Sequence, residues 1–353
     1  MMGPVKLLID ELRVSASDLS NFLACRHLTR LDTARAHGRV PHPHLRDVGR
    51  DALVARGDQN EEAVRNRFLE RGWAIATIPI DWGHPEVSAE QTRAAIARGA
   101  DVIDQAVFLD GDRYGRADFL IRADLLREGA RGYEVVDAKL ARSAKANAVL
   151  QIAYYTRLLT AVQGFAPEWM HLALGGEEEL QPFRVAAYGA YERQVYRLLT
   201  EFLATDETGA PTYPEPNEHC VICRWRVVCN RKRHDDDDLS LVAGISSRQR
   251  KALKEAGIMT LESFADLDLL PQLDRVNTDS LTAQGMAAPC PGTPGASCIA
   301  RRGAQVEALR VLSGRRRHRS RRHGSGRGRP LRMLPPPGGC GTSARVRGHP
   351  RWR

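Results

Sequence analysis

The stretch YEVVDAKLARSAKANAVLQIAYY, residues 133–155, places charged residues inside an apolar strand pattern and then continues as an apolar helical pattern. Residues two apart in a strand share one face, so Asp137 and Lys139 point to the same side of this strand. Burial of an isolated charge is costly unless a partner compensates it. The stretch therefore indicates either a functional site in which partners compensate the buried charges, or the salt-bridged face of an exposed strand.

The net charge of +9 on this 353-residue chain comes from its C-terminal tail. After Glu307 there are 14 arginines and no acidic residue, and removing these 14 charges leaves −5 for residues 1–307. A basic net charge is typical of nucleic-acid binding. Because residues 1–307 are mildly acidic, any nucleic-acid groove among them has to be formed by a local cluster of basic residues. The length is sufficient for a large buried core.

No part of the sequence has the length and apolar character of a membrane span. Charges interrupt the apolar residues of MMGPVKLLIDELRVSASDLS, residues 1–20, and nowhere do about 18 apolar residues run together. We therefore expect a cytoplasmic protein without a signal peptide and without a membrane partner.

The periodicity of the apolar residues predicts an alternation of helices and strands. Helices are predicted over 15–37, 59–72, 88–101, 146–162 and 188–204, and strands over 73–80, 105–109, 114–126, 132–141 and 168–175. Short connections such as DGDR, residues 110–113, separate the three central strands. This order predicts an α/β fold whose three central strands form a meander.

Three segments are expected along the chain. Residues 1–239 form the main domain, which ends in a cysteine-rich segment, and residues 240–270 form a small helical module. Residues 271–353 are rich in Arg, Gly and Pro and contain no lysine. That composition indicates either a disordered basic tail or a sequence read out of frame from a GC-rich gene.

A second carboxylate is expected beside the charged strand. Asp118, in GRADFLIR at residues 115–122, lies on the strand that precedes the one carrying Asp137. Two carboxylates from neighbouring strands can hold a divalent metal ion, and a lysine can orient or activate the attacking water of phosphodiester hydrolysis. The residues therefore predict a metal-dependent hydrolytic site, with the salt-bridged strand as the alternative.

These residues resemble the RecB-like branch of the PD-(D/E)XK nucleases, a family related to AddB and the CRISPR-associated Cas exonucleases. The family pattern is an Asp, a D/E-x-K on the next strand and Q-x-x-x-Y on the following helix. GRADFLIR carries Asp118, VVDAK carries Asp137 and Lys139, and QIAYY carries Gln151 and Tyr155. Residues four apart share a helix face, so Gln151 and Tyr155 point the same way.

The resemblance covers about residues 12–268 and implies a restriction-endonuclease-like core, a mixed sheet flanked by helices. It implies Mg²⁺ or Mn²⁺ bound by Asp118 and Asp137, with Lys139 orienting or activating the water. It also implies that Gln151 and Tyr155 position the substrate.

One position departs from the family pattern. Members usually carry a histidine as a further metal ligand in a G-x-x-H-E motif, whereas RGDQNEEAV has Gly57 and Glu61 in place and Asn60 at the histidine position. An amide oxygen can ligate a hard cation, although it is a weaker ligand than a carboxylate. Asn60 and Glu61 are thus candidate auxiliary metal ligands, and Asn60 as an ordinary exposed helix residue is the alternative.

Four of the seven cysteines are candidate ligands. An odd number of cysteines in a reducing compartment argues against a disulfide framework. Cys220, Cys223 and Cys229 form a C-x2-C-x5-C run, which lacks the second C-x-x-C of a zinc ribbon. In the nuclease family such a run and one N-terminal cysteine, here Cys25, bind a 4Fe-4S cluster, and the resemblance implies the same cofactor. Zinc and unliganded buried cysteines are the alternatives.

The triplet Arg224, Trp225 and Arg226 lies between the cysteines. An aromatic residue flanked by cations suits either the stacking of a base with phosphate contacts or packing over the cysteine cluster.

The segment LVAGISSRQRKALKEAGIMTLESFADL, residues 241–267, resembles a helix-hairpin-helix unit. The glycines of such units let backbone N–H groups approach a DNA phosphate. The glycines and cations of the segment are Gly244, Gly257, Arg248, Arg250, Lys251 and Lys254. An ordinary pair of helices with glycine caps is the alternative.

The combined features predict a metal-dependent nuclease that acts on single-stranded DNA or duplex ends, as an exonuclease rather than an endonuclease. The resemblance implies a role in DNA repair or recombination, with a possible helicase partner. The alternatives are a catalytically impaired iron-sulfur DNA-binding module, in which Asn60 marks a lost active site, and a zinc-stabilised interaction protein.

Overall fold

The structure is a computed structural model that describes residues 6–8, 11–41, 43, 48–205 and 211–267. The predictions for residues 271–353, which include three cysteines, lie outside these residues. Among the helices of the described chain, none has the combined length and apolar character that crossing a membrane requires.

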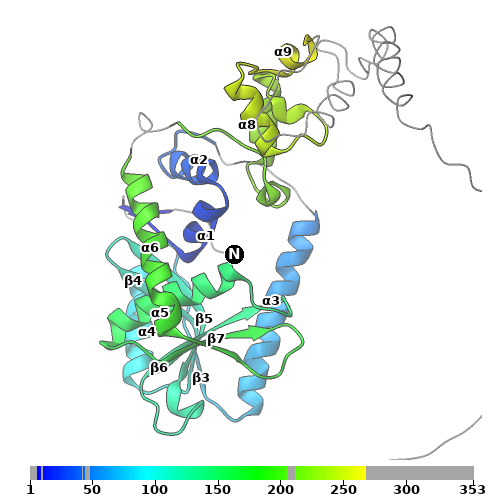
Figure 1. Cartoon of the computed structure of the whole chain (residues 1–353). Helices are drawn as coiled ribbons and strands as arrows, with labels where there is room; N and C mark the ends of the chain where they lie inside the picture. Colours follow the sequence, from blue (N-terminus) through cyan, green and yellow to red (C-terminus); the bar gives the residue numbers. More distant parts are fainter. Residues whose placement is uncertain (1–5, 9–10, 42, 44–47, 206–210, 268–353) are drawn as a thin grey trace, which may run out of the picture. The chain divides into compact units, whose positions relative to one another are not determined.

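A mixed six-stranded sheet flanked by helices confirms the α/β class (Figure 1). In spatial order its strands are β3 (Ile75–Thr77), β4 (Val102–Asp110), β5 (Arg113–Arg122), β6 (Tyr133–Lys139), β7 (Trp169–Leu174) and β8 (Gln181–Arg184). The predicted meander is β4, β5 and β6, which pair antiparallel. The pairs β3–β4 and β6–β7 are parallel, and a parallel pair needs a crossover, which a long helix supplies between β6 and β7.

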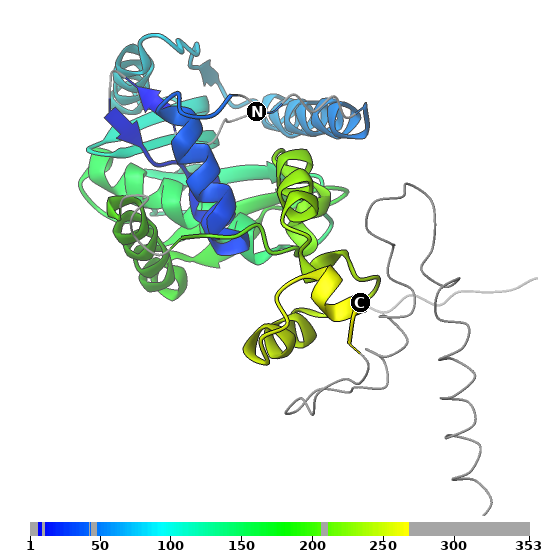
Figure 2. The same cartoon turned by 90° about the horizontal axis from the view of Figure 1, so that it is seen from above.

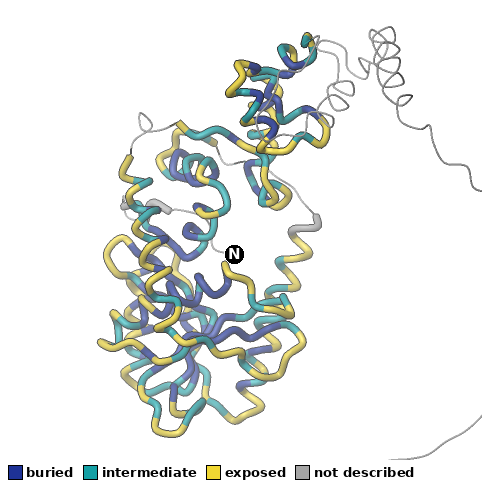
Figure 3. The backbone as a smooth tube through the Cα atoms, in the orientation of Figure 1, coloured by how far each residue is buried: buried dark blue, intermediate teal, exposed yellow. Residues whose placement is uncertain are grey.

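Helices pack on both faces of this sheet. The larger apolar core involves α1 (Ala16–Ala24), α4 (Pro85–Ala97), α5 (Ala146–Gln163) and α6 (Val185–Ala204). Helix α1 packs against both α5 and α6 (Figure 2). On the other face, α3 (Val48–Glu70) packs Val64 and Phe68 against Phe119 of β5. Because side chains alternate along a strand, β5 contributes Phe119 to one core and Leu120 to the other, so the sheet has a core on each side. Most residues of the central strands are buried (Figure 3).

The remaining elements are short. They are β1 (Lys6–Leu8), β2 (Glu11–Arg13), α2 (Arg26–Ala36), α7 (Arg226–Asp235), α8 (Ser247–Glu255), α9 (Leu261–Ala265) and the 3-10 turns η1 (Ala123–Leu125), η2 (Glu218–Val221) and η3 (Leu239–Leu241). Around η3, α8 and α9 a separate apolar cluster forms, with Leu239, Leu253 and Phe264 at its centre. The proposed boundary of a helical module near residue 240 stays a prediction.

The prediction of one continuous helix over 15–37 is wrong at one residue, Cys25, which separates α1 from α2. Cys25 is extended, with φ −162° and ψ 110°, and its sulfur accepts a hydrogen bond from the Leu28 N–H at 3.4 Å. A side chain that caps the following helix competes with continuation of the preceding one. Strand β8 was not predicted, and α3 begins at Val48 instead of at residue 59.

Helix α5 approaches β5 closely at Gly115. A Cβ atom at this position would lie 2.4 Å from Leu158 Cδ1 and 3.3 Å from Tyr155 Cδ1, so a larger residue would push the helix away. The helix ends at Gly164, whose φ of 81° gives a left-handed cap. Glycine at position 115 thus brings the middle of α5 against the strand that carries Asp118.

Candidate active site and cysteine pocket

Asp118, Asp137 and Lys139 lie together on the adjacent strands β5 and β6. The Asp118 carboxylate accepts a hydrogen bond from the Ala138 N–H at 2.8 Å, which ties it to the neighbouring strand. Asp137 is fully buried and forms an ion pair with Lys139, whose side chain is 29% exposed. The shared strand face predicted for Asp137 and Lys139 therefore holds two groups in direct contact.

Gln151 and Tyr155 face this pair from α5. The Gln151 Nε2 group donates to Asp137 Oδ1 at 3.3 Å and to the Tyr155 hydroxyl at 3.1 Å. Tyr155 has no exposed surface, so in this structure it supports Gln151 instead of reaching a substrate itself. The predicted role of Gln151 and Tyr155 in positioning the substrate stays a prediction.

Glu61 reaches the site from α3 through a residue that was not predicted, Gln105 of β4. The Gln105 Nε2 group donates to the Glu61 carboxylate. In the β4–β5 register, Asp104 pairs with Phe119 and Ala106 with Ala117, which places Gln105 opposite Asp118. Asn60 is partly buried on α3, and among the described residues no hydrogen bond links it to the other site residues.

The negative charges of the carboxylates in this site are not balanced by the positive charges around them. Burial, and then repulsion from Asp137, raise the pKa of Asp118 to about 7, although Lys139 opposes this. Burial, and then the charge of Asp118, raise the pKa of Glu61 to about 7, against the influence of Arg116. Burial alone would lower the pKa of Lys139, but the surrounding carboxylates outweigh it and raise that pKa. Lys139 therefore stays an ammonium group, and the site carries excess negative charge.

The oxygen donors of the site suit a hard divalent cation, although the side chains are not arranged as a closed metal site. Within the described residues, no group of three or more His, Cys, Asp and Glu side chains is placed to hold a metal ion. Buried carboxylates of like charge repel one another when no cation lies between them. The donor chemistry of Glu61, Asp118 and Asp137 fits Mg²⁺ or Mn²⁺ better than a softer metal.

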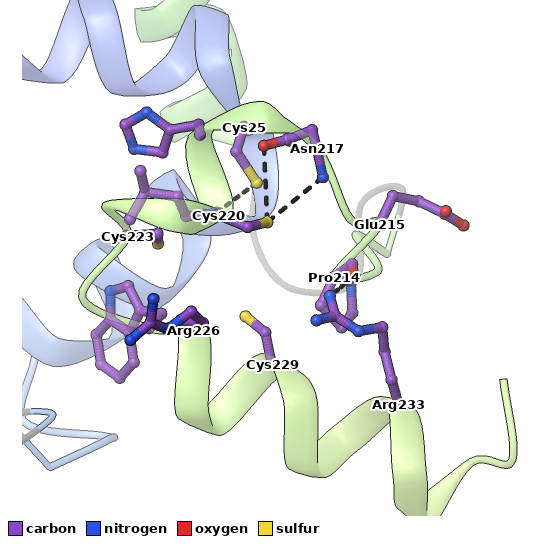
Figure 4. Close-up of a pocket in the computed structure, with 12 residues that line it drawn as sticks. Cys25, Pro214, Glu215, Asn217, Cys220, Cys223, Arg226, Cys229 and Arg233 are labelled. Carbon is purple, nitrogen blue, oxygen red and sulfur yellow. Dashed lines mark hydrogen bonds between the residues drawn. The ribbon is translucent and has the colours of Figure 1, made fainter. Parts of the chain in front are cut away.

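The four cysteines predicted as ligands line one pocket (Figure 4). Cys25 lies at the junction of α1 and α2, Cys220 and Cys223 lie in and beside η2, and Cys229 lies in α7. All four are free thiols. Burial, and then the proximity of Cys223, raise the pKa of Cys229 to about 12. The break in the helix at Cys25 therefore serves to place its sulfur near a segment almost 200 positions later in the chain.

Trp225 forms an apolar part of the wall of this cysteine pocket. Its side chain is 2% exposed and packs with Leu28 and Cys223. Its indole N–H donates to Asp32 Oδ1 at 2.8 Å, and Arg224 lies 3.5 Å from the same carboxylate. The interpretation of Trp225 as a base-stacking residue is wrong, and packing against the cysteines is what the structure shows.

In the downstream module, three of the four predicted phosphate-binding cations have carboxylate partners, one of which is an exposed pair of Lys251 with Glu255 at 3.8 Å. Arg250 is 5% exposed and its guanidinium lies 2.9 Å from Glu215. Lys254 lies 3.0 Å from the buried Asp238. Both glycines of the segment have positive φ, 73° at Gly244 and 83° at Gly257, as their turns require. Arg250 and Lys254 therefore contribute to packing, which favours the ordinary helical pair over a DNA-binding hairpin.

Comparisons with known proteins give one relative of stated activity. No protein-family model matches this chain. The CRISPR-associated exonuclease Cas4 of Aeropyrum pernix is 31% identical over 111 residues, which are 29% of this chain and 54% of that protein. The chain thus spans about half the length of this curated relative. The solved structure of SSO0001 is 16% identical, covers 42% of this chain and 68% of its own, and has a TM-score of 0.23, too low to carry an argument.

Proposed function

We propose that this chain is a divalent-cation-dependent DNA nuclease of the RecB-like PD-(D/E)XK type, with a restriction-endonuclease-like core. The observation that carries the proposal is the hydrogen bond of Asp118 to the strand that carries the ion pair of Asp137 and Lys139, in a partly buried site with excess negative charge. The similarity to the Cas4 exonuclease supports the same reaction class. Perturbed pKa values at a mixed acid and lysine cluster are typical of catalytic sites.

In this proposal Asp118, Asp137 and Glu61 hold Mg²⁺ or Mn²⁺, with Asn60 as an auxiliary ligand. The bound cation would polarise the phosphodiester and stabilise the charge that develops during hydrolysis. The residues around it have defined tasks. The Ala138 N–H fixes the Asp118 carboxylate, and Gln151 fixes that of Asp137.

Lys139 orients the attacking water as an ammonium group that donates hydrogen bonds and accepts no proton. Its ammonium group stays charged because the surrounding carboxylates raise its pKa, and it is partly exposed, so a water molecule can reach it. Tyr155 keeps its proton because burial, and then the charges of Asp137 and Asp118, raise its pKa. A protonated Tyr155 hydroxyl holds Gln151 in place behind the reacting groups.

The proposed substrate is single-stranded DNA or a duplex end, with exonucleolytic action. We place the activity in cytoplasmic DNA repair or recombination, with a helicase as the expected partner. Residues 1–239 would form the nuclease domain and residues 240–270 a small module joined to it.

A cleavage assay tests the proposal directly. The full chain is incubated with end-labelled single-stranded DNA and with blunt duplex DNA, in Mg²⁺, Mn²⁺ or EDTA. Cleavage that needs the cation and disappears in Lys139→Ala, while DNA binding persists, supports the nuclease. A parent chain that binds DNA without cation-dependent cleavage contradicts it and favours the catalytically impaired DNA-binding module, in which Asn60 marks the loss.

The cysteine pocket is proposed to bind a 4Fe-4S cluster through Cys25, Cys220, Cys223 and Cys229. Four free thiols that line one pocket are the donor set that such a cluster requires. Anaerobic purification, visible absorbance and analysis of iron, sulfide and zinc test this. About four irons per chain support the cluster, whereas stoichiometric zinc in a colourless protein supports the zinc alternative.

A further inference from the structure

Gln105 has a backbone conformation that its residue type rarely adopts. Its φ is 61°, in the left-handed region, although it lies within strand β4. Among the described residues, Asp237 is the other non-glycine residue with positive φ, at 52°. Asp tolerates this region through local hydrogen bonds, whereas Gln has no such advantage. The conformation of Gln105 is therefore strained, and strain of this kind collects at functional sites.

The structure on either side holds Gln105 in this conformation. The Asp104 carboxylate accepts hydrogen bonds from Arg65 Nε at 3.1 Å and from Thr77 Oγ1 at 3.0 Å. On the other side, the Val107 N–H donates to Thr92 Oγ1 of α4 at 2.9 Å. Contacts from α3, β3 and α4 thus fix the chain just before and just after Gln105.

The two ends of the Gln105 amide differ in their partners. Nε2 donates to the Glu61 carboxylate, whereas Oε1 is buried and has no hydrogen-bond partner among the described residues. Buried polar atoms are almost always paired, so an unpaired oxygen beside carboxylates needs an explanation. Gln105 also lies opposite Asp118 in the sheet register.

We propose that Gln105 is a positioning residue of the cation site, which holds Glu61 towards Asp118 and offers Oε1 as a neutral oxygen ligand to a divalent cation. The inference rests on the proposed function and adds to it a residue that the nuclease motif does not contain. It also gives this chain an amide ligand on β4, in addition to Asn60 at the position of the missing histidine. The strained backbone is the cost of directing the side chain to that place.

Three substitutions separate strain from chemistry. Gln105→Gly and Gln105→Asn both tolerate positive φ but cannot reach Glu61, so each should raise the melting temperature of the metal-free chain and weaken Mn²⁺ binding about tenfold or more. Gln105→Met keeps the length and the strain but loses the amide, so it should weaken Mn²⁺ binding without raising the melting temperature. Asp237→Asn is the matched control, which should leave Mn²⁺ affinity unchanged.

Mn²⁺ affinity is measured by calorimetry and by the electron paramagnetic resonance signal of bound Mn²⁺, on the full chain and without DNA. If all three Gln105 variants bind Mn²⁺ as the parent does, the strained residue serves packing alone, and the inference is overturned while the nuclease proposal stands. If the parent itself binds no Mn²⁺, both the inference and the proposed cation site are overturned. Weaker binding in the Gln105 variants, with unchanged binding in Asp237→Asn, supports the inference.

Discussion

Glu134 is a buried carboxylate and Asp118 a half-buried one on opposite faces of the same sheet, and their surroundings differ in charge. Glu134 is 1% exposed and accepts hydrogen bonds from Arg127 at 2.5 and 3.1 Å and from His171 at 2.7 Å. Burial alone would raise the pKa of Glu134, but these partners lower it. Asp118 accepts the Ala138 N–H, and its pKa rises to about 7.

The difference shows how a structural charge is told from a candidate functional one. Glu134 has the donors that an ionised carboxylate needs, so its charge is stable inside the fold. Asp118 lies near the carboxylates of Asp137 and Glu61, and the single positive charge of Lys139 does not balance three negative charges. A site that is short of positive charge in the folded chain is one in which a cation would be stabilised.

The largest expected effect is on catalysis. Asp118→Asn keeps the acceptor for the Ala138 N–H but removes the charge, and we expect DNA cleavage to fall about 10²–10³-fold or more. Cleavage of end-labelled single-stranded DNA in Mn²⁺ measures this effect.

Glu134→Gln is the matched control for this substitution, because it also neutralises a carboxylate of the same sheet. Its cleavage rate should stay within about twofold of the parent rate, since charge at that position is structural. An equal loss in both variants, with both folded, would remove the distinction between the two carboxylates.

The next effect is on stability. Glu134→Gln leaves Arg127 and His171 without their carboxylate, and we expect the free energy of unfolding to fall by about 2–3 kcal/mol. The value lies below that for a fully buried pair because the Arg127 side chain is 35% exposed. Urea denaturation at neutral pH measures it, and Asp118→Asn should show no such loss. A Glu134→Gln variant as stable as the parent would refute the structural role.

The smallest effect is a pH dependence. The folded-state pKa of Asp118, about 7, lies above its ordinary value, so its favourable contribution is complete below the unfolded pKa and is lost as pH rises through the folded pKa. An asparagine does not titrate. The stability of Asp118→Asn relative to the parent should therefore increase by about 1–2 kcal/mol between about pH 6 and about pH 8. Metal-free urea titrations check this, and a constant difference across that range would show that Asp118 has an ordinary pKa.

The α/β class and the central meander were predictable from sequence because apolar alternation is strong over 105–141 and because α5 is uninterrupted up to Gly164. The break at Cys25 was not predictable, since the apolar spacing of Leu19, Phe22 and Leu28 continues across it. What breaks the helix is the hydrogen bond of one sulfur to Leu28, which periodicity does not show.

For the candidate site, the motif pointed to Asp118, Asp137 and Lys139, and the structure places these side chains side by side, although their role stays a proposal. Gln105 was missed because its distinctive feature is a backbone angle, which only the folded chain has. In the sequence it follows Asp104, and these two polar residues interrupt an apolar strand, VIDQAVF at 102–108; this interruption is the signal that could have drawn attention to it.

The most direct test of the distinction between the two carboxylates is a Mn²⁺ titration by calorimetry at neutral pH, on the parent, Asp118→Asn and Glu134→Gln. We predict that the parent and Glu134→Gln bind Mn²⁺ with equal affinity, and that Asp118→Asn binds it about tenfold more weakly or worse. Equal binding by all three chains, or no binding by the parent, would contradict the assignment of the uncompensated carboxylates as the cation site.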